Sequence, residues 1–293
     1  MKRVALWRTQ ANCGCLSGMR LLSGSLRVRA CTVLVAASAL AAVAGCASGD
    51  FLRAAHVSLE RALRVESPGA FFAPVLARAT GEELPPPPSW QARQHYLAVI
   101  FNLESISAQA ENSLKYEGKL GDAFVLKTLA QWRLGRIDDA RNSALRARAS
   151  GQDALDAHDR ALFRAFDGVI RLNAAFDALK EGKPVASIEE LISGDSGAWR
   201  LLAGARTEIG RRDPLQRDLI LARLAAFKVL LEARARDPEA AAASTDVWKR
   251  LRAEAQVELA ELAALPTDLP STLAATVQRW QKLCGLSSPA VAG

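Results

Sequence analysis

The sequence has few of the residues on which metal and nucleophilic chemistry depend. Its 293 residues include three histidines and five cysteines. Beyond residue 45 there is no His-Glu-x-x-His, Glu-x-x-His or paired-cysteine pattern, so a zinc or di-iron centre is not expected. A phosphate-binding loop and a Gly-x-Ser-x-Gly nucleophile turn are also missing. We therefore nominate no catalytic residue, no metal ligand and no dissociable cofactor, and we expect a protein that is not an enzyme.

Patterns typical of β-strands are missing as well. No stretch of alternating Val, Ile, Thr and Tyr is bounded by turn residues, and apolar residues recur at helical spacing instead. Glycine and proline number 19 and 12, and 50% of the residues are hydrophobic, which excludes collagen-like and disordered chains. The length suffices for one domain of about 250 residues with a buried core. We therefore expect an all-α protein.

A strong charge of one sign is absent from most of the chain. The whole sequence carries 38 Lys and Arg against 31 Asp and Glu, a formal net charge of +7. Six of these bases and none of the acids lie within residues 1–45, so the remainder carries 32 bases against 31 acids. A body this close to neutral gives no reason to expect phosphate binding, and we expect no nucleic-acid partner.

The basic N-terminal segment has the layout of an export signal. A stretch that contains Arg20, Arg27 and Arg29 precedes an apolar run over residues 31–44. An uninterrupted run of about 15 residues suits the apolar region of a signal peptide and is short for a membrane span, which needs about 20. The run leads into four consecutive residues: Val43, Ala44, Gly45 and Cys46.

That tetrapeptide resembles the lipobox of bacterial lipoproteins. The resemblance implies that residues 1–45 are a lipoprotein signal peptide. It also implies that Cys46 becomes the first mature residue and carries covalent diacylglycerol and an N-acyl lipid. A signal of normal length would open at Met19, which is therefore a candidate true start. The alternative is an ordinary signal peptide with a chance cysteine.

The residues after Cys46 indicate where the lipid would hold the protein. In envelope lipoproteins, an Asp directly after the lipidated cysteine tends to retain the protein at the inner membrane. Ala47 occupies that position here, so the resemblance favours the outer membrane, with the protein facing the periplasm. Residues 46–49 form the lipidated tether. Three or four extended residues span roughly 10–14 Å, so the folded body is expected to lie close to the bilayer.

The mature chain is expected to form helix after helix over residues 50–285, followed by a loose tail over 286–293. The start signals are Asp50, the Ser187 and Glu190 capping box, Asp213-Pro214, Asp237-Pro238 and Ser271. The proline run Pro85–Pro88 is expected to be non-helical. The expected helices span about 50–66, 70–79, 90–116, 124–134, 136–147, 153 or 156 to 180, 187–192, 196–210, 214–235, 238–264 and 271–284, where Asp153 or Asp156 starts the helix to 180.

One segment carries the most diagnostic spacing. Two expected helices flank Gly135, and small side chains follow at Ala140 and Ala147. Glycine permits a turn between helices, and alanine lets two helix backbones approach closely. This spacing resembles one tetratricopeptide repeat.

The resemblance implies an irregular, tetratricopeptide-like right-handed α-solenoid of antiparallel helix pairs. Other signature positions depart from the motif: Thr128 replaces a small residue, Ala144 replaces a large aromatic, and Gln152 stands where proline is usual. No second unit matches equally well. The alternative is a generic helical hairpin, and both interpretations give the same fold class.

Two short polar segments could be taken for functional sites, but each is interpreted as the start of a helix. Asp156 and Asp159 share a helix face while His158 points elsewhere, so these three make a poor metal trio and are interpreted as a solvated helix start. In the string over residues 194–197, Asp195 or Ser196 is interpreted as a helix cap.

Two tryptophans and one cysteine remain to be placed. Trp90 follows the proline run and Trp280 lies on the last expected helix, and either is a candidate exposed docking aromatic. Cys284 is the only cysteine after Cys46, so no intramolecular disulfide is expected within the mature chain, and we interpret Cys284 as a small buried apolar residue.

These patterns favour a non-enzymatic, outer-membrane-anchored periplasmic lipoprotein. We expect it to act as a protein–protein interaction scaffold or adaptor in envelope assembly, secretion or transport, held to the membrane by its lipid and bound to an envelope protein partner. The alternative is a ligand-handling helical lipoprotein, accessory to a substrate-binding-protein-dependent uptake system. That alternative predicts a pocket or pore lined by polar residues.

Overall fold

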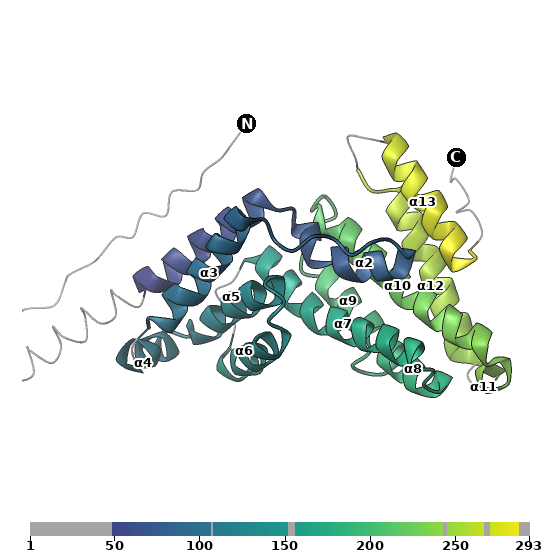
Figure 1. Cartoon of the computed structure of the whole chain (residues 1–293), viewed down its shortest axis with the longest axis horizontal. Helices are drawn as coiled ribbons and strands as arrows, with labels where there is room; N and C mark the ends of the chain where they lie inside the picture. Colours follow the sequence, from purple (N-terminus) through teal and green to yellow (C-terminus); the bar gives the residue numbers. More distant parts are fainter. Residues whose placement is uncertain (1–48, 107, 152–155, 243–244, 267–269, 287–293) are drawn as a thin grey trace, which may run out of the picture. The chain divides into compact units, whose positions relative to one another are not determined.

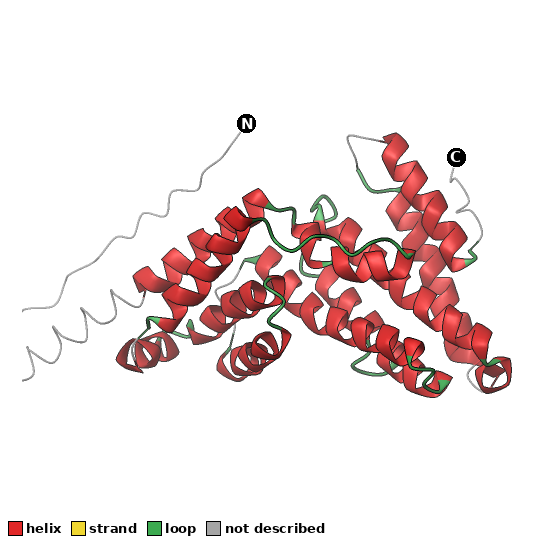
Figure 2. Ribbon diagram, viewed as in Figure 1, coloured by secondary structure: helices red, strands yellow, loops and turns green. Residues whose placement is uncertain are grey.

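The structure is a computed structural model that describes residues 49–106, 108–151, 156–242, 245–266 and 270–286. Throughout these ranges the regular structure is helical and no strand occurs (Figure 2). The prediction of an all-α protein is therefore confirmed for this part of the chain. None of the helices described is both long and apolar enough to cross a membrane.

The first described helix spans residues 49–65 and buries one face. Ala55, Leu59 and Ala62 are at most 1% exposed, as their helical spacing predicts. Asp50 lies inside this helix, so its predicted role as the N-terminal cap is wrong.

The predicted short helix over 70–79 is two elements. A 3-10 helix, η1 (Pro68–Phe71), is followed by α2 (Ala73–Thr80). Ser67 caps η1, because its hydroxyl accepts a hydrogen bond from the Gly69 N–H at 3.1 Å. The chain after α2 is non-helical over residues 82–89 and includes the proline run, as predicted.

The single helix predicted over 90–116 is also two helices, α3 (Trp90–Glu104) and α4 (Ala108–Tyr116). The break comes at Ser105, whose hydroxyl donates to the Phe101 carbonyl at 2.7 Å. Serine competes with the backbone for hydrogen bonds in this way, which favours helix ends over helix interiors.

The tetratricopeptide-like segment forms two helices, α5 (Leu120–Arg133) and α6 (Ile137–Ser150), which pack side by side (Figure 1). Gly135 turns the chain between them at φ 76°. The helix expected from about residue 124 begins at Leu120, so Gly121 lies inside α5. A Cβ at Gly121 would lie 1.3 Å from the Gly151 carbonyl oxygen, so its role is close backbone approach.

Three helices follow: α7 (Ala157–Lys180), α8 (Val185–Ser193) and α9 (Ala198–Arg206). Of the two predicted start residues, Asp153 and Asp156, it is Asp156 that caps α7, since its carboxylate accepts the Asp159 N–H at 2.8 Å. Two other cap predictions are wrong. Helix α8 begins two residues before Ser187, with Pro184 at the cap, and Gly197 occupies the cap of α9 in place of Asp195 or Ser196.

The C-terminal helices are α10 (Leu215–Arg236), α11 (Pro238–Ala242), α12 (Thr245–Ala263) and α13 (Pro270–Cys284). The Asp213-Pro214 start signal is right, because Asp213 accepts the Leu215 N–H at 2.9 Å. The segment predicted as one helix over 238–264 is α11 and α12, and residues 243–244 lie outside the described part. Helix α10 packs against both α12 and α13.

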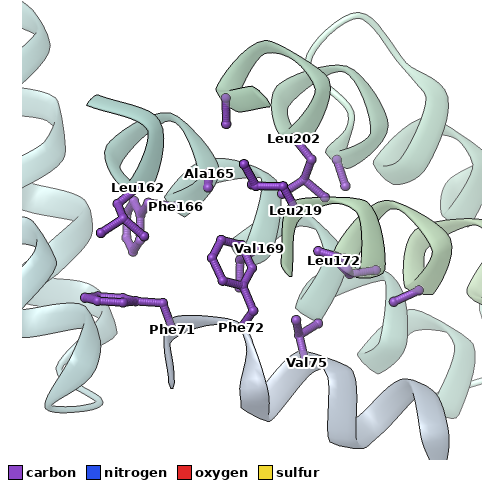
Figure 3. Packing of buried hydrophobic residues seen from close by; sticks show 14 of the residues in the cluster. Phe71, Phe72, Val75, Leu162, Ala165, Phe166, Val169, Leu172, Leu202 and Leu219 are labelled. Carbon is purple, nitrogen blue, oxygen red and sulfur yellow. The ribbon is translucent and has the colours of Figure 1, made fainter. Parts of the chain in front are cut away.

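The core joins segments that are far apart in sequence. Phe71 and Phe72 pack with Val75 against α7 (Figure 3), and α2 also contacts α10. The ring of Trp132 of α5 lies next to Phe71 and to Phe166 of α7, with centroid distances of 4.7 Å and 5.3 Å. Buried aromatic pairs at such distances add to the energy of apolar burial. The short segment η1–α2 therefore ties the N-terminal helices to the centre of the protein.

Candidate functional site

The predicted lipid-attachment sequence lies outside the part of the chain that the structure describes. Val43, Ala44, Gly45 and Cys46 all precede residue 49. The lipidation of Cys46 therefore stays a prediction.

One face of α3 presents three apolar side chains to solvent. Trp90, Leu97 and Phe101 are 77%, 37% and 71% exposed. Spacings of seven and four residues place them along one side of the helix, whereas Tyr96 and Ile100 are buried on another side. We call these three exposed residues the α3 stripe. Exposed apolar groups gathered in this way are typical of an interaction surface.

The second predicted docking aromatic is not at the surface. Trp280 on α13 is 3% exposed, because this part of α13 packs against α10 and α12. Cys284 is buried on the same helix, with its Sγ 3.6 Å from the Leu224 carbonyl oxygen. Burial raises the pKa of the Cys284 thiol to about 12. The prediction of Trp280 as an exposed anchor is wrong, and the predicted burial of Cys284 is confirmed.

A pocket of about 490 Å³ lies among residues of α9, α10 and α12. Arg206 donates hydrogen bonds to the carboxylates of Glu258 and Glu261. The side chain of Gln216 accepts from Arg206 at 3.0 Å and donates to the Arg206 and Ile209 carbonyls, both at 3.2 Å. The polar groups of this pocket are therefore fixed by one another.

Arg223 is a buried member of the network of hydrogen bonds and ion pairs that lines this pocket. It is 7% exposed, pairs with Glu258, and places its guanidinium 4.1 Å from the ring centroid of Trp199. Burial, followed by the charge of Arg206, lowers the pKa of Arg223 to about 10, so this side chain still carries its charge at neutral pH. The pocket thus holds cations and anions in contact, which suits a polar ligand of small net charge.

A second hollow lies where α4, α5 and α6 meet. Two pockets of about 180 and 370 Å³ share Phe124, Lys127 and Arg146 in their linings. The Arg146 guanidinium lies 4.0 Å from the Phe124 ring centroid and pairs with Glu111 at 2.8 Å. Lys127 pairs with Glu104 at 2.9 Å. This polar hollow lies on the helix pair that carries the tetratricopeptide-like spacing.

The fold also assembles a charged cluster that no local sequence pattern indicates. His56 of the first helix lies beside Asp156 and Asp159 at the start of α7, with one nitrogen or oxygen of each within 4.8 Å of the others. Asp159 is 3% exposed, and burial, together with the charge of Asp156, raises its pKa to about 6. His158 points elsewhere, as predicted, and its Nδ1 lies 3.3 Å from Asp213.

Comparisons with known proteins supply no relative from which to transfer a function. No model of a protein family matches the chain, and neither curated proteins nor solved structures give a match.

Proposed function

We propose that this protein is a non-enzymatic lipoprotein of the bacterial outer membrane that faces the periplasm and holds an envelope protein partner close to the bilayer. It acts as a scaffold or adaptor in envelope assembly, secretion or transport. The observation that carries the partner-binding role is the α3 stripe, where Trp90 and Phe101 are more than two-thirds exposed. Large aromatic side chains dominate the binding energy of protein interfaces.

The scaffold itself is proposed to be an irregular, tetratricopeptide-like right-handed stack of antiparallel helix pairs. The α5–α6 pair supports this description, because Gly135 turns the chain and Ala140 and Ala147 are fully buried on the second helix. Stacked helix pairs present surfaces that bind peptides or proteins without any chemistry.

The charges near the α3 stripe favour a protein partner over direct contact with lipid. The sequence of α3 contains one arginine, Arg93, and one acid, Glu104, and both are exposed. A helix that lies in a membrane interface is typically rich in lysine and arginine on its polar face. Helix α3 itself lacks that excess of bases, and its one exposed base and one exposed acid suit the polar rim of a protein interface.

The test is co-purification of the palmitate-labelled, full-length protein from detergent-solubilised native envelopes. Cys46→Ser should abolish acyl labelling. The double variant Trp90→Ser, Phe101→Ser should lose a partner that the parent protein recovers. The matched control is Tyr116→Ser, Leu145→Ser, which changes residues that are 95% and 63% exposed outside the α3 stripe, and it should keep the partner.

Two results would contradict the adaptor proposal. One is recovery of the same proteins by both double variants. The other is stripe-dependent binding of the Cys46→Ser protein to lipid vesicles with no protein partner recovered, which would make the stripe a membrane contact.

The pocket among α9, α10 and α12 favours a second candidate function, a ligand-handling lipoprotein accessory to an uptake system. Its polar lining and its volume of about 490 Å³ suit a small polar molecule. Gln216→Ala removes hydrogen bonds inside the pocket. It should therefore lower the affinity for any ligand that raises the melting temperature of the parent protein. Ligand binding with no stripe-dependent partner would favour this function over the adaptor.

A further inference from the structure

Asp159 buries a carboxylate oxygen that no hydrogen-bond donor satisfies. Its Oδ2 is fully buried and has no hydrogen-bond partner among the described residues. The Nδ1 of His56 faces this oxygen at 3.6 Å, which is within ion-pair distance for a protonated imidazole but beyond hydrogen-bond distance. A buried carboxylate oxygen without a partner is costly, and such groups in native proteins are usually paired or bound to a metal.

The charges around Asp159 add to this cost. Asp156 and Glu60 repel the Asp159 carboxylate, and the groups that act in the opposite direction are His56 and His158. One oxygen of Asp156 already accepts the Asp159 N–H at 2.8 Å, as a helix cap should. Capping therefore accounts for Asp156 but leaves the buried Oδ2 of Asp159 without a hydrogen-bond donor.

From this geometry we propose that His56, Asp156 and Asp159 form a binding site for a divalent transition-metal ion of the zinc class. The candidate ligand atoms already lie within 4.8 Å of one another. Zinc bonds of about 2.0–2.2 Å bring neighbouring ligand atoms to roughly 3.0–3.5 Å, so small side-chain rotations complete the site. His56 and Asp156 are partly accessible to solvent, which leaves an entry path for the ion.

Glu60 strengthens the assignment. It lies one helical turn after His56, and its carboxylate is 3.4 Å from His56 Nε2. Histidines that bind a metal through one ring nitrogen commonly place the other against a carboxylate, which fixes the orientation of the ring. Here Nδ1 faces Asp159 while Nε2 faces Glu60, so the imidazole is held in the orientation that metal binding needs.

The ligand set selects among cations. Imidazole suits zinc and other late first-row ions, whereas calcium and magnesium prefer oxygen ligands alone. One histidine with two aspartates should therefore bind Zn²⁺ or Co²⁺ and discriminate against Ca²⁺. The sequence predicts no metal site because His56 and the aspartates lie on helices that are far apart in the chain.

The test uses the full-length protein in detergent, freed of metal with EDTA and titrated with Zn²⁺ by calorimetry. We expect one Zn²⁺ per chain, with affinity at least tenfold weaker in His56→Gln and in Asp159→Asn. Glu60→Gln should weaken binding by a smaller factor. The matched control is His95→Gln, which removes a histidine on α3 and should leave the affinity unchanged.

A melting experiment separates a metal site from a merely structural cluster. A fixed excess of Zn²⁺ should raise the melting temperature of the parent protein and of His95→Gln clearly more than that of Asp159→Asn. Co²⁺ should give visible absorption bands in the parent that are absent in His56→Gln. Absence of Zn²⁺ binding, or equal binding by all variants, would overturn the proposal.

Discussion

Asp218 illustrates how a single residue can couple stability to pH. It lies in the first turn of α10 against η1, where a Cβ added to Gly69 would be 2.8 Å from Asp218 Oδ2. Burial raises the pKa of Asp218 to about 6, with Arg217 acting weakly in the opposite direction. A carboxyl group with a raised pKa holds its proton more tightly in the folded state. Its contribution to stability is therefore present at low pH and is lost as the pH rises from about 4 through 6.

Asp218→Asn should accordingly stabilise the protein at pH 8 more than at pH 5. A folded-state pKa near 6 against about 4 in the unfolded chain corresponds to at most about 3 kcal/mol in total, of which about half separates pH 5 from pH 8. Urea unfolding at the two pH values measures the difference. Asp138→Asn, at a side chain that is 93% exposed, is the matched control and should show no such pH-dependent gain. An equal gain for Asp218→Asn at both pH values would contradict the argument.

Gly121→Ala should destabilise the protein by about 3 kcal/mol, because the added Cβ would meet the Gly151 carbonyl oxygen at 1.3 Å and force α5 away from the end of α6. Gly204→Ala, in α9, is the opposite case. No atom lies within 4 Å of its added Cβ, so the better helix propensity should stabilise by about 0.5–1 kcal/mol. Chemical denaturation of both variants checks the pair, and a neutral Gly121→Ala would show that the close approach does not matter.

At the scale of the helices, the sequence predicted which segments are helical better than it predicted the residues at which each helix begins and ends. Apolar periodicity located the helices correctly because one buried face repeats over several turns, as Ala55 and Leu59 illustrate. Capping patterns predicted the wrong helix end where burial of an apolar side chain contributes more free energy than the cap. Helix α8 begins at Val185, which is 4% exposed, so the capping pattern at Ser187 lies inside the helix and not at its start. A cap contributes about 1 kcal/mol, less than burying a large apolar side chain.

The candidate site residues also fall into two groups: those whose burial the sequence indicates and those whose burial depends on other helices. The burial of Cys284 could be anticipated because a lone cysteine behaves as a small apolar residue, and Trp90 was one of two candidate exposed tryptophans. Trp280 could not, because which face of α13 is covered depends on where α10 lies. The His56 cluster and the Arg206–Glu258 pair were missed for the same reason, because each joins residues from different helices.

At the scale of the whole molecule, the feature that bears most on cooperative unfolding is the position of η1 and α2. In a regular repeat protein each unit contacts only its neighbours, and unfolding can proceed unit by unit. Here α2 contacts α7 and α10, which follow it at a large distance in sequence (Figure 1). Phe71 also joins α5 through Trp132. These contacts should couple the described helices into one cooperative unit.

Phe72→Ala should therefore lower the free energy of unfolding by about 3–5 kcal/mol and keep a single transition. Phe72 is 0% exposed, belongs to the buried cluster of Figure 3 and has its ring centroid 6.2 Å from that of Trp132. Phe101→Ala, at a residue that is 71% exposed, is the matched control and should change stability by less than about 0.5 kcal/mol. Urea unfolding followed by circular dichroism and by tryptophan fluorescence checks both. Two separated transitions would mean that the helices unfold as independent units.

The sequence by itself determined the all-α class, most helix positions, the close packing at Ala140 and the near-neutral charge of the body, because these follow from local spacing and composition. It also carries the lipobox-like tetrapeptide on which the envelope proposal rests. Only the tertiary structure decided that Trp280 is covered, that Gly121 is a contact point and that His56 meets Asp159. The physical reason is that burial and pairing between helices depend on contacts between distant residues, which no local pattern records.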